Sequence, residues 1–517
     1  MTQIESNLGE LNDVVQLVKR HNPLHKVNIK YGYILFGLSC LFIIIRLSAL
    51  QFYNRSWKRS GRSTSNLRIS KLPLPITVSL VVLTIAILMV IKPHLEKISV
   101  LIKRMGRLSY TLTPLTIFLA AEPSWFPIDN YLNTLQLHKW ISRIIVLLGV
   151  FHGIGFLIYY VVNNTLEKVL RPVNFIGVII FILGIIMMIF WKPIRNLNYK
   201  VFYVFHNIFF LTYITLTYLH ARPGVSLFYF ISIGLLFAQY IRKYLYVKDI
   251  TITEIIENPG SDYKIIKFPK SLLPESYLPG SHVRIGASKW SPFFIMLPSH
   301  PYTVATTFEN RDLLATLIVK NTKFQLQPFE TYSIQTNFKS SINENFFLTA
   351  ENIVIVCGGS GISLGLVLFE FFKRSIVADG KDIKIKFIWV TKDEKDLFIL
   401  NDLNIQGVDV YITNGINEDI LEQDEIDMQE SENSAVPLME LSNNSSDSLN
   451  TYETKFANTA IVGKRPNVED ILQKSLSKTL DYANKWIVSC GPPSLNKRCE
   501  SIATKEKCRF FSEEYSF

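Results

Sequence analysis

Hydrophobic residues are distributed unevenly along this chain of 517 residues. In the first half they gather in long runs, whereas in the second half short apolar runs alternate with polar residues and glycine-containing turns. A helix needs about 20 predominantly apolar residues to cross a bilayer. Runs that approach this length span residues 31–50, 75–92, 107–121, 135–161, 174–191, 201–220 and 226–245. The pattern predicts a polytopic α-helical membrane domain of about seven transmembrane helices at 31–245.

The third run is the weakest of these predictions, because it is short and contains Pro114. Proline is tolerated in membrane helices where neighbouring groups satisfy the backbone groups that it frees. The polar segment at 1–30 lacks the charged, apolar and small-residue order of a cleavable signal. We therefore expect the first membrane helix itself to direct insertion.

The second half carries the pattern of a soluble protein with two domains. Short alternating strands at 246–345, among them LPGSHVRIG and HPYTVATT, predict a small β-barrel. Three later segments indicate an α/β domain at 346–517: NIVIVCGGSGISLGLVLFEFF, KIKFIWVTKDEKDLFIL and KWIVSCGPPSL. Residues 416–456 are acidic, rich in Ser and Asn and poor in aromatics, which predicts a disordered insertion within this domain.

The charge and cysteine content indicate which partners and which cellular compartment to expect for this protein. The net charge of +11 is spread over loops that flank the apolar runs, which predicts membrane lipid rather than nucleic acid as a partner. The five cysteines have no paired spacing typical of a disulfide framework or a zinc site, and four of them lie in the second half. This distribution suits a reducing cytosol, although the Lys and Arg counts of the short loops do not settle the orientation.

Four histidines inside the predicted helices share one spacing. His138 and His152 lie 14 residues apart, and so do His206 and His220. Fourteen residues make about 3.9 helical turns, so the two histidines of a pair lie on nearly the same face, roughly 21 Å apart along the axis. If the two helices pack side by side, the imidazoles form two facing couples, one near each membrane surface.

Facing imidazoles hold a low-spin haem iron through two axial nitrogens and leave no open position for a small ligand. Two stacked haems would make an electron path across the membrane, and Arg143 could meet a haem propionate. The alternative is that the histidines hydrogen-bond across helices as structural residues. The identical spacing on two separate helices favours haem.

The α/β half contains two candidate nucleotide loops. Gly358, Gly359 and Gly361 allow a tight turn in which a phosphate can approach the N-terminus of the next helix. Such turns also occur in α/β proteins without a nucleotide, so this signal alone leaves both interpretations open. Gly491 and Pro492 would shape a loop at the carboxyl end of the sheet, beside Cys490, whose alternative role is that of a buried core thiol.

Taken together, these segments resemble the ferric reductase and NADPH oxidase superfamily, and most closely its fungal metalloreductase branch. The resemblance runs from about residue 75 to the C-terminus, interrupted by the acidic insertion. Its membrane signature is matched by RMGRLSYTLTPLTIFLA, HKWISR and IRNLNYKVFYVFH. It implies two b-type haems on the four histidines, and a ferredoxin-reductase-like module made of a FAD β-barrel and an NADP-binding α/β domain.

The resemblance also implies individual cofactor contacts. The flavin motif is matched by His300, Pro301, Tyr302 and Thr303. The nucleotide loop is matched by Gly358, Gly359, Ser360, Gly361, Ile362 and Ser363, and the nicotinamide-side loop by Cys490, Gly491 and Pro492. The terminal Phe517 is expected to cover the flavin until nicotinamide displaces it.

Two departures from the family pattern concern the dinucleotides. The segment LIVKNTKFQLQPFE lacks the usual FAD pyrophosphate contact, which stays unassigned. Lys392 stands where the family often has an arginine, and it would pair with the 2′-phosphate of NADPH without a bidentate fork.

The implied enzyme carries electrons from cytosolic NADPH to an acceptor across the membrane. Ferric or cupric chelates are the first expected acceptors, molecular oxygen giving superoxide is the second, and a non-catalytic regulatory membrane subunit is the competing class. Cytosolic NADPH places the C-terminal half in the cytosol. With seven spans, the inner couple is then His138 with His206 and the outer couple is His152 with His220, in the plasma membrane or the endoplasmic reticulum.

Overall fold

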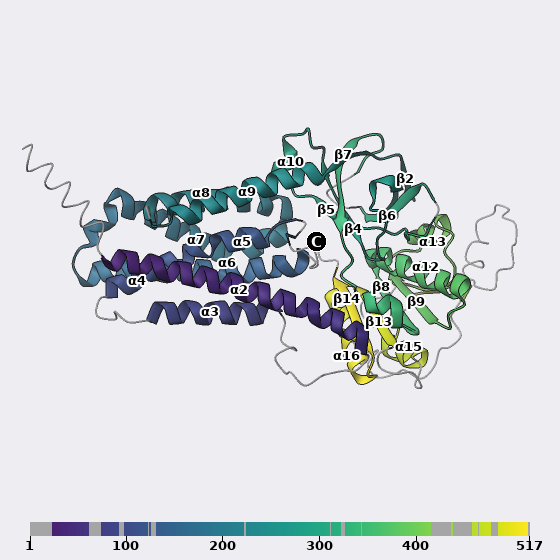
Figure 1. Ribbon diagram of the computed structural model, residues 1–517. Coiled ribbons are helices and arrows are strands. Elements are labelled where there is room, and N and C mark those ends of the chain that lie inside the picture. The colour runs from purple at the N-terminus through teal and green to yellow at the C-terminus, as the bar shows by residue number, and fades with distance from the viewer. Residues whose placement is uncertain are drawn as a thin grey trace, which may run out of the picture. The chain divides into compact units, whose positions relative to one another are not determined.

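The computed structural model falls into two compact units (Figure 1). One unit comprises Met1–Tyr246 with Met296–Pro298, and the other comprises Val247–Ile295 with Ser299–Phe517. The structure describes residues 23–60, 74–91, 98–122, 124–125, 131–221, 224–310, 312–321, 326–342, 344–414, 436–437, 458–463, 465–476 and 484–514.

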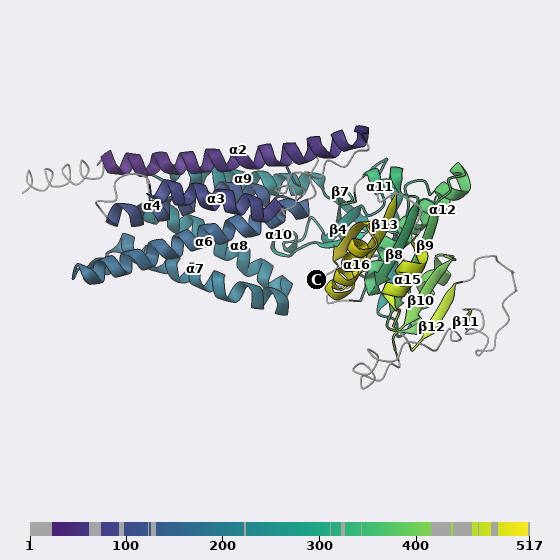
Figure 2. The same ribbon diagram turned by 90° about the horizontal axis from the view of Figure 1, so that it is seen from below.

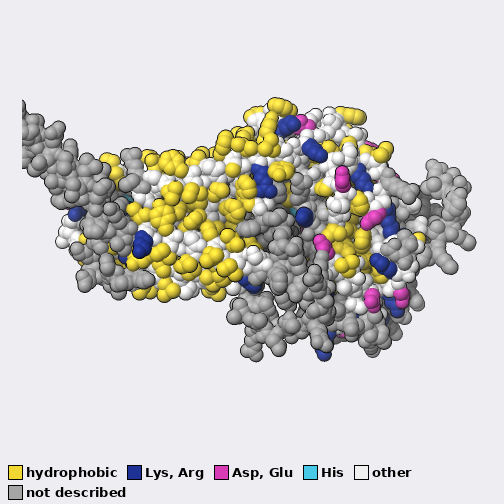
Figure 3. Space-filling view, viewed as in Figure 1, with side chains coloured by type: hydrophobic (Ala, Val, Ile, Leu, Met, Phe, Trp, Pro, Cys, Tyr) yellow, Lys and Arg dark blue, Asp and Glu magenta, His cyan; other side chains and the backbone are white. Residues whose placement is uncertain are grey.

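The first unit is a bundle of helices that run side by side in both views (Figures 1 and 2). Its helices are α2 (Pro23–Ser60), α3 (Leu74–Ile91), α4 (Ile98–Thr111), α5 (Thr113–Leu119), α6 (Tyr131–Val162), α7 (Pro172–Leu197), α8 (Tyr199–Ala221) and α9 (Ser226–Tyr246), with the short η2 (Leu166–Leu170). Helix α6 packs against α3, α4, α5 and α7, and α7 packs against α8. Apolar side chains such as Leu108 and Ile141 fill the interior, and others cover the outside (Figure 3). This all-round hydrophobicity is expected of helices surrounded by lipid.

Each of the seven predicted apolar runs contains a helix. The third run, 107–121, is not one continuous helix. It is divided between α4 and α5 at Leu112, and Pro114 stands in the first turn of α5. The break follows from chemistry, because proline has no amide hydrogen to continue the helical ladder. Stretches long and apolar enough to cross a membrane are Ile29–Ser48, Thr134–Val162, Pro172–Leu197 and Tyr199–Ala221, with a shorter one at Pro75–Ile91. The count of seven spans stays a prediction.

The second unit begins with two antiparallel sheets. The first has the order β1 (Lys248–Thr251), β7 (Thr331–Phe338), β4 (His282–Ala287), β5 (His300–Thr303), and the second β2 (Glu254–Glu257), β3 (Tyr263–Pro269), β6 (Leu314–Lys320). A bridge between Val304 and Leu317 links them. Alternate residues such as Phe268 and Ile285 point into a shared apolar core, as expected for strands with one buried face. The short elements η3 (Lys270–Leu272) and α10 (Phe293–Met296) lie in the connections.

The rest of the unit is a three-layer α/β domain. Its sheet has the order β11 (Val436–Pro437), β12 (Thr459–Val462), β10 (Val408–Ile412), β9 (Lys384–Thr391), β8 (Asn352–Gly358), β13 (Lys485–Gly491), β14 (Arg509–Glu514). All described neighbours are parallel except β11 with β12. The helical elements are α11 (Glu344–Thr349), η4 (Gly359–Gly361), α12 (Ile362–Asp379), η5 (Glu394–Leu397), α13 (Phe398–Asp402), α15 (Val468–Ser475) and α16 (Pro493–Lys505).

Alternation along β8 explains the layers. Ile353 and Ile355 join the cluster that includes α12, whereas Val354 and Val356 join the cluster that includes α15 and α16. A strand that is apolar on both faces must be covered on both, so the sheet is sandwiched between helices. Within the predicted acidic insertion, only Val436–Pro437 belong to the described residues.

The order of the parallel strands reverses between β8 and β13. From β8 the chain proceeds outward through β9, β10 and β12, and then returns to the other side of β8 with β13 and β14. In open α/β sheets, ligands bind outside the carboxyl ends of the strands at such a switch point. The loops that follow Gly358 and Gly491 are therefore the candidate ligand-binding loops of this sheet.

Candidate functional site

The helical unit brings the four predicted histidines together in two couples. His138 and His152 lie on α6, and His206 and His220 lie on α8. The ring centroids of His138 and His206 are 6.1 Å apart with planes at 83°, and those of His152 and His220 are 6.2 Å apart at 74°. Equal spacing on two helices thus yields two couples of nearly the same geometry.

The separations fit a metal held between the rings. An imidazole nitrogen binds a metal at about 2.0–2.1 Å and lies about 1.1 Å from its ring centre, so two rings on opposite sides of one iron have centres about 6.3 Å apart. The observed values of 6.1 and 6.2 Å agree with this figure. Ordinary edge-to-face packing covers the same range, so the ring nitrogens must be considered as well.

Backbone carbonyls fix the ring nitrogens of three histidines. Nδ1 lies 3.0 Å from the carbonyl oxygen of Thr116 for His138, 2.7 Å from that of Ile102 for His152, and 2.7 Å from that of Val173 for His220. A carbonyl only accepts, so each Nδ1 carries the proton and Nε2 keeps the lone pair that a metal needs.

His206 is the exception, and its surroundings are aromatic. Its Nδ1 is buried with no hydrogen-bond partner among the described residues. The ring of Phe202 stacks on it at 5.7 Å, and the ring of Trp191 lies 5.1 Å away. Metal-bound histidines usually donate their second ring N–H to an oxygen acceptor, so His206 differs from the other three histidines, and aromatic packing rather than a carbonyl orients its ring.

Two glycines make room for the histidine rings. An added Cβ at Gly106 of α4 would lie 2.8 Å from Cγ of His152, and one at Gly177 of α7 would lie 2.7 Å from Cε1 of His220. Each glycine follows by four residues the carbonyl that accepts from the same ring. Sequence reasoning missed both, since glycine in an apolar helix is common. The position of Gly106 inside the quoted RMGRLSY segment was the one available signal.

Arg143 lies outside this set of contacts. Its guanidinium is exposed and sits 4.7 Å from the ring centroid of Trp140. A stacked arginine on a membrane helix suits the interface with water, so its contact with a propionate stays a prediction.

The two candidate nucleotide loops lie side by side at the switch point. Cys490 pairs with Cys357 across β13 and β8. A Cβ at Gly361 would stand 2.2 Å from the carbonyl oxygen of Cys490, and a Cβ at Gly358 would stand 3.0 Å from Cδ of Pro492. Glycine is therefore required where the loops touch.

The other predicted members of the nucleotide loop follow directly. Ser360 is in η4, and Ile362 and Ser363 begin α12, where Ser363 Oγ donates to the carbonyl of Ile318 at 3.3 Å. Gly359 adopts φ +57°, and its carbonyl accepts from Nε1 of Trp389 at 3.1 Å. Helix α12 begins directly after this turn, and the N-terminus of a helix is a favourable position for an anion.

Lys392 follows β9 at the same edge of the sheet. Its side chain is exposed, and its carbonyl accepts from the amide of Asn414 at 2.9 Å. Strand β9 is the neighbour of β8, with Val390 opposite Gly358. A cation is therefore available one strand away from the glycine-rich loop.

The predicted flavin motif forms strand β5 at the end of its sheet. His300, Pro301, Tyr302 and Thr303 pair with Ile285, Arg284, Val283 and His282 of β4. Arg284 is buried and donates to Ser299, through Nε to Oγ at 2.9 Å and through Nη2 to the carbonyl at 2.7 Å. Burial, with a smaller contribution from Arg284, lowers the pKa of His282 to about 3, so this ring is neutral.

Polar groups close to this strand fit a ligand such as FAD. Strand β5 stands at the edge of its sheet, with β4 as its neighbour there among the described residues. The hydroxyl of Thr307, four residues after the motif, is buried with no partner in the described part of the chain. Phe517 lies outside the described residues, and the last described strand ends with Glu514 opposite Gly491.

Three sequence families match the chain in order. They are described as ferric reductase like transmembrane component at residues 105–217, FAD-binding domain at 250–350 and ferric reductase NAD binding domain at 350–504. A ferredoxin-NADP+ reductase structure from Plasmodium falciparum gives a TM-score of 0.31 at 14% identity, covering 52% of this chain and 95% of that chain. A likeness this weak adds nothing to the assignment.

Curated relatives match along nearly the whole length. The protein named "Probable metalloreductase AIM14" of Scheffersomyces stipitis is 32% identical, covering 98% of each chain. Its namesake in Saccharomyces cerevisiae is 30% identical, covering 97% of this chain and 99% of that one. With these relatives and with helices that can cross a membrane, the chain belongs to the ferric-reductase-like family of membrane proteins that carry FAD-binding and NAD-binding domains.

Proposed function

We propose that this protein is a transmembrane oxidoreductase that carries electrons from NADPH, by way of FAD and two b-type haems, to a ferric or cupric chelate across the membrane. The observation that carries the proposal is the pair of histidine couples with centroid separations of 6.1 and 6.2 Å. Two couples of nearly equal geometry support two equivalent haem positions along the same pair of helices.

In this proposal His138 and His206 hold one haem, and His152 and His220 hold the other. FAD, when bound, supplies the conversion of a two-electron hydride donor to single-electron chemistry, and haem iron supplies one-electron transfer. The carbonyls of Thr116, Ile102 and Val173 would keep three rings in the tautomer that presents Nε2.

The soluble half binds the dinucleotides. The backbone from Gly358 to Ser363 receives the pyrophosphate of NADPH, and Lys392 meets its 2′-phosphate as a point charge. The loop from Cys490 to Pro492 lines the nicotinamide side, while the β5 motif from His300 to Thr303 holds FAD. Phe517 covers the flavin, and Arg143 meets a haem propionate.

We propose the domain boundaries 1–30, 31–245, 246–345 and 346–517, and about seven spans with the soluble half in the cytosol. Because NADPH is cytosolic, the His138–His206 couple is the inner one. The membrane is the plasma membrane or the endoplasmic reticulum. The name metalloreductase, given to the relatives, favours a metal chelate as acceptor.

The acceptor can be tested in membranes that contain the expressed protein. They are reduced anaerobically with NADPH, and haem reoxidation is followed after adding a ferric chelate or oxygen. Fast reoxidation by the chelate supports the metalloreductase, whereas fast reoxidation by oxygen with superoxide makes the protein an NADPH oxidase. Membranes that show no b-haem signal at all would identify a non-catalytic subunit, and a His206→Ala variant provides the control.

A further inference from the structure

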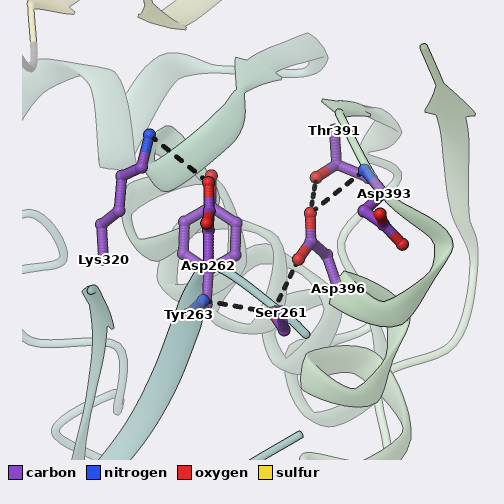
Figure 4. Close-up of polar contacts among 7 residues, drawn as sticks. All are labelled: Ser261, Asp262, Tyr263, Lys320, Thr391, Asp393 and Asp396. Atoms are coloured by element: carbon purple, nitrogen blue, oxygen red, sulfur yellow. Dashed lines mark hydrogen bonds and ion pairs between the residues drawn. The ribbon is translucent and has the colours of Figure 1, made fainter. Parts of the chain in front are cut away.

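A turn of the β-barrel donates two hydrogen bonds to the loop that carries Lys392. The turn is Asn258–Ser261, between β2 and β3, and the loop is Thr391–Asp396, directly after β9, here called the Lys392 loop. Ser261 Oγ donates to Oδ1 of Asp396 at 2.6 Å (Figure 4). Asn258 Nδ2 donates to the carbonyl of Lys395 at 2.9 Å. The contact joins segments about 135 residues apart in the chain.

Asp396 is the centre of this contact. It is 1% exposed. Its second oxygen, Oδ2, accepts from Oγ1 of Thr391 at 2.5 Å and from the amide of Asp393 at 3.4 Å (Figure 4). Within the described residues it forms no ion pair, so hydroxyl and amide donors alone stabilise its charge. A buried carboxylate is costly unless such donors surround it. Loss of one donor therefore weakens the placement of Asp396, and with it the placement of the residues that donate to it.

These bonds fix the backbone on both sides of Lys392. Thr391, which precedes it, bonds to Asp396, and its carbonyl accepts from the amide of Thr413 at 2.9 Å. Asp393, which follows it, is bound by Asp396 through its amide. The exposed side chain of Lys392 carries a flexible point charge. A fixed backbone removes part of the entropy that such a side chain loses when it meets a phosphate.

The same end of β3 also reaches the glycine-rich loop. Tyr263, two residues after Ser261, has its hydroxyl 3.1 Å from the position of a Cβ at Gly359. Burial first, and then the nearby charge of Asp396, raise the pKa of Tyr263. Residues at the start of one barrel strand therefore lie against both loops that are expected to receive NADPH.

We propose that Asp396 is a positioning residue that holds the Lys392 loop against the barrel through Ser261, and thereby sets the preference for a dinucleotide with a 2′-phosphate over one without it. The inference rests on the proposed use of NADPH and deepens it. It assigns part of the nucleotide selectivity to a contact made by the flavin-side barrel, through the Ser261–Asp396 hydrogen bond.

The test measures selectivity in the full-length purified protein. Binding of adenosine 2′,5′-bisphosphate is compared with binding of 5′-AMP by calorimetry, and kcat/KM for NADPH with that for NADH. In Asp396→Asn and in the milder Ser261→Ala, the preference for the 2′-phosphate is expected to fall about tenfold, the size of one lost charge-assisted bond. The KM for NADPH rises, whereas the KM for NADH and both kcat values stay within about twofold of the wild type.

The matched control is Asp262→Asn, which removes a neighbouring surface carboxylate that pairs with Lys320 at 3.9 Å (Figure 4). It is expected to leave the preference unchanged. A double variant of Asp396→Asn with Lys392→Ala should discriminate no worse than Lys392→Ala alone, because both act through one contact.

Two results would overturn the inference: an unchanged 2′-phosphate preference in both Asp396→Asn and Ser261→Ala, or full additivity with Lys392→Ala. Selective binding of the bisphosphate by a protein that oxidises neither dinucleotide is a different outcome. It would refute the proposed function while the positioning role of Asp396 is retained.

Discussion

Gly106 lies directly against the ring of His152, so that a Cβ at this glycine would stand 2.8 Å from the ring Cγ. The carbonyl of Ile102, one turn earlier on the same helix, accepts from Nδ1 of that ring at 2.7 Å. Helix α4 therefore supplies both the space and the hydrogen-bond acceptor that set the orientation of the histidine. A methyl group at position 106 must turn the ring or push the helices apart.

Gly106→Ala is expected to lower the affinity of the His152–His220 couple for haem about 10- to 100-fold, as for other losses of ligand orientation. The measurement is haem per polypeptide in the purified protein, together with the reduced-minus-oxidised spectrum. Gly234→Ala on α9 is the control, because nothing lies within 4 Å of a Cβ there. Full haem content with an unaltered spectrum in Gly106→Ala would contradict the role given to this contact.

Replacing either member of a couple should remove the same haem. We expect His138→Ala and His206→Ala each to lose one of two components in a redox titration, and their double variant to lose no more than either one. The reason is that an iron with one axial imidazole no longer has the bis-histidine, low-spin coordination. If His138→Ala and His206→Ala abolished different components, the pairing would be wrong.

Gly361→Ala should damage the nucleotide site and spare the flavin. The new Cβ would stand 2.2 Å from the carbonyl oxygen of Cys490, which forces the two loops apart. A shift of about 1 Å can cost about 100-fold in rate, so kcat/KM for NADPH is expected to fall by that order. Flavin content and NADPH-driven reduction are measured beside Val377→Ala, an exposed control on α12. A normal kcat/KM for NADPH in Gly361→Ala would contradict the expectation that NADPH oxidation requires the close approach of the two loops.

Much of the site follows from local spacing. The 14-residue interval of the histidines places both members of a pair on one helix face, and the structure has them in two couples. The loops that follow Gly358 and Gly491 lie side by side because β8 and β13 are neighbouring strands at the switch point. The sequence of neither segment alone predicts this pairing of strands. Pro114 was the visible sign that the third apolar run is broken.

The parts that the sequence could not predict depend on the backbone or on distant partners. The carbonyls of Thr116, Ile102 and Val173 orient the histidines, but every residue has a carbonyl and the side chains carry no signal. Asp396 lies in the run KDEKD, which is typical of an exposed turn. It is buried because Ser261, far away in the chain, supplies a donor.

Glu513 on β14 carries a carboxyl whose Oε2 is buried without a hydrogen-bond partner among the described residues, although the side chain as a whole is partly exposed. Burial raises the pKa of Glu513 from 4.5 to about 7. The folded protein therefore favours the neutral acid, and the unfolded chain ionises at lower pH. The resulting stability is fully present below about pH 4.5 and is lost as the pH rises through about 7.

Glu513→Gln should remove this dependence on pH. The rise of the Glu513 pKa from 4.5 to about 7 corresponds to about 3 kcal/mol. At pH 8 the variant is therefore expected to be more stable than the wild type by up to that amount, and at pH 5 nearly equal to it. Denaturant unfolding of the flavin-bearing unit, followed by flavin fluorescence in the full-length protein at pH 5, 6, 7 and 8, measures the difference. Glu500→Gln, an exposed change on α16, should follow the wild type. Equal slopes of stability against pH for the wild type and Glu513→Gln would mean that the carboxyl reaches solvent or a partner when it ionises.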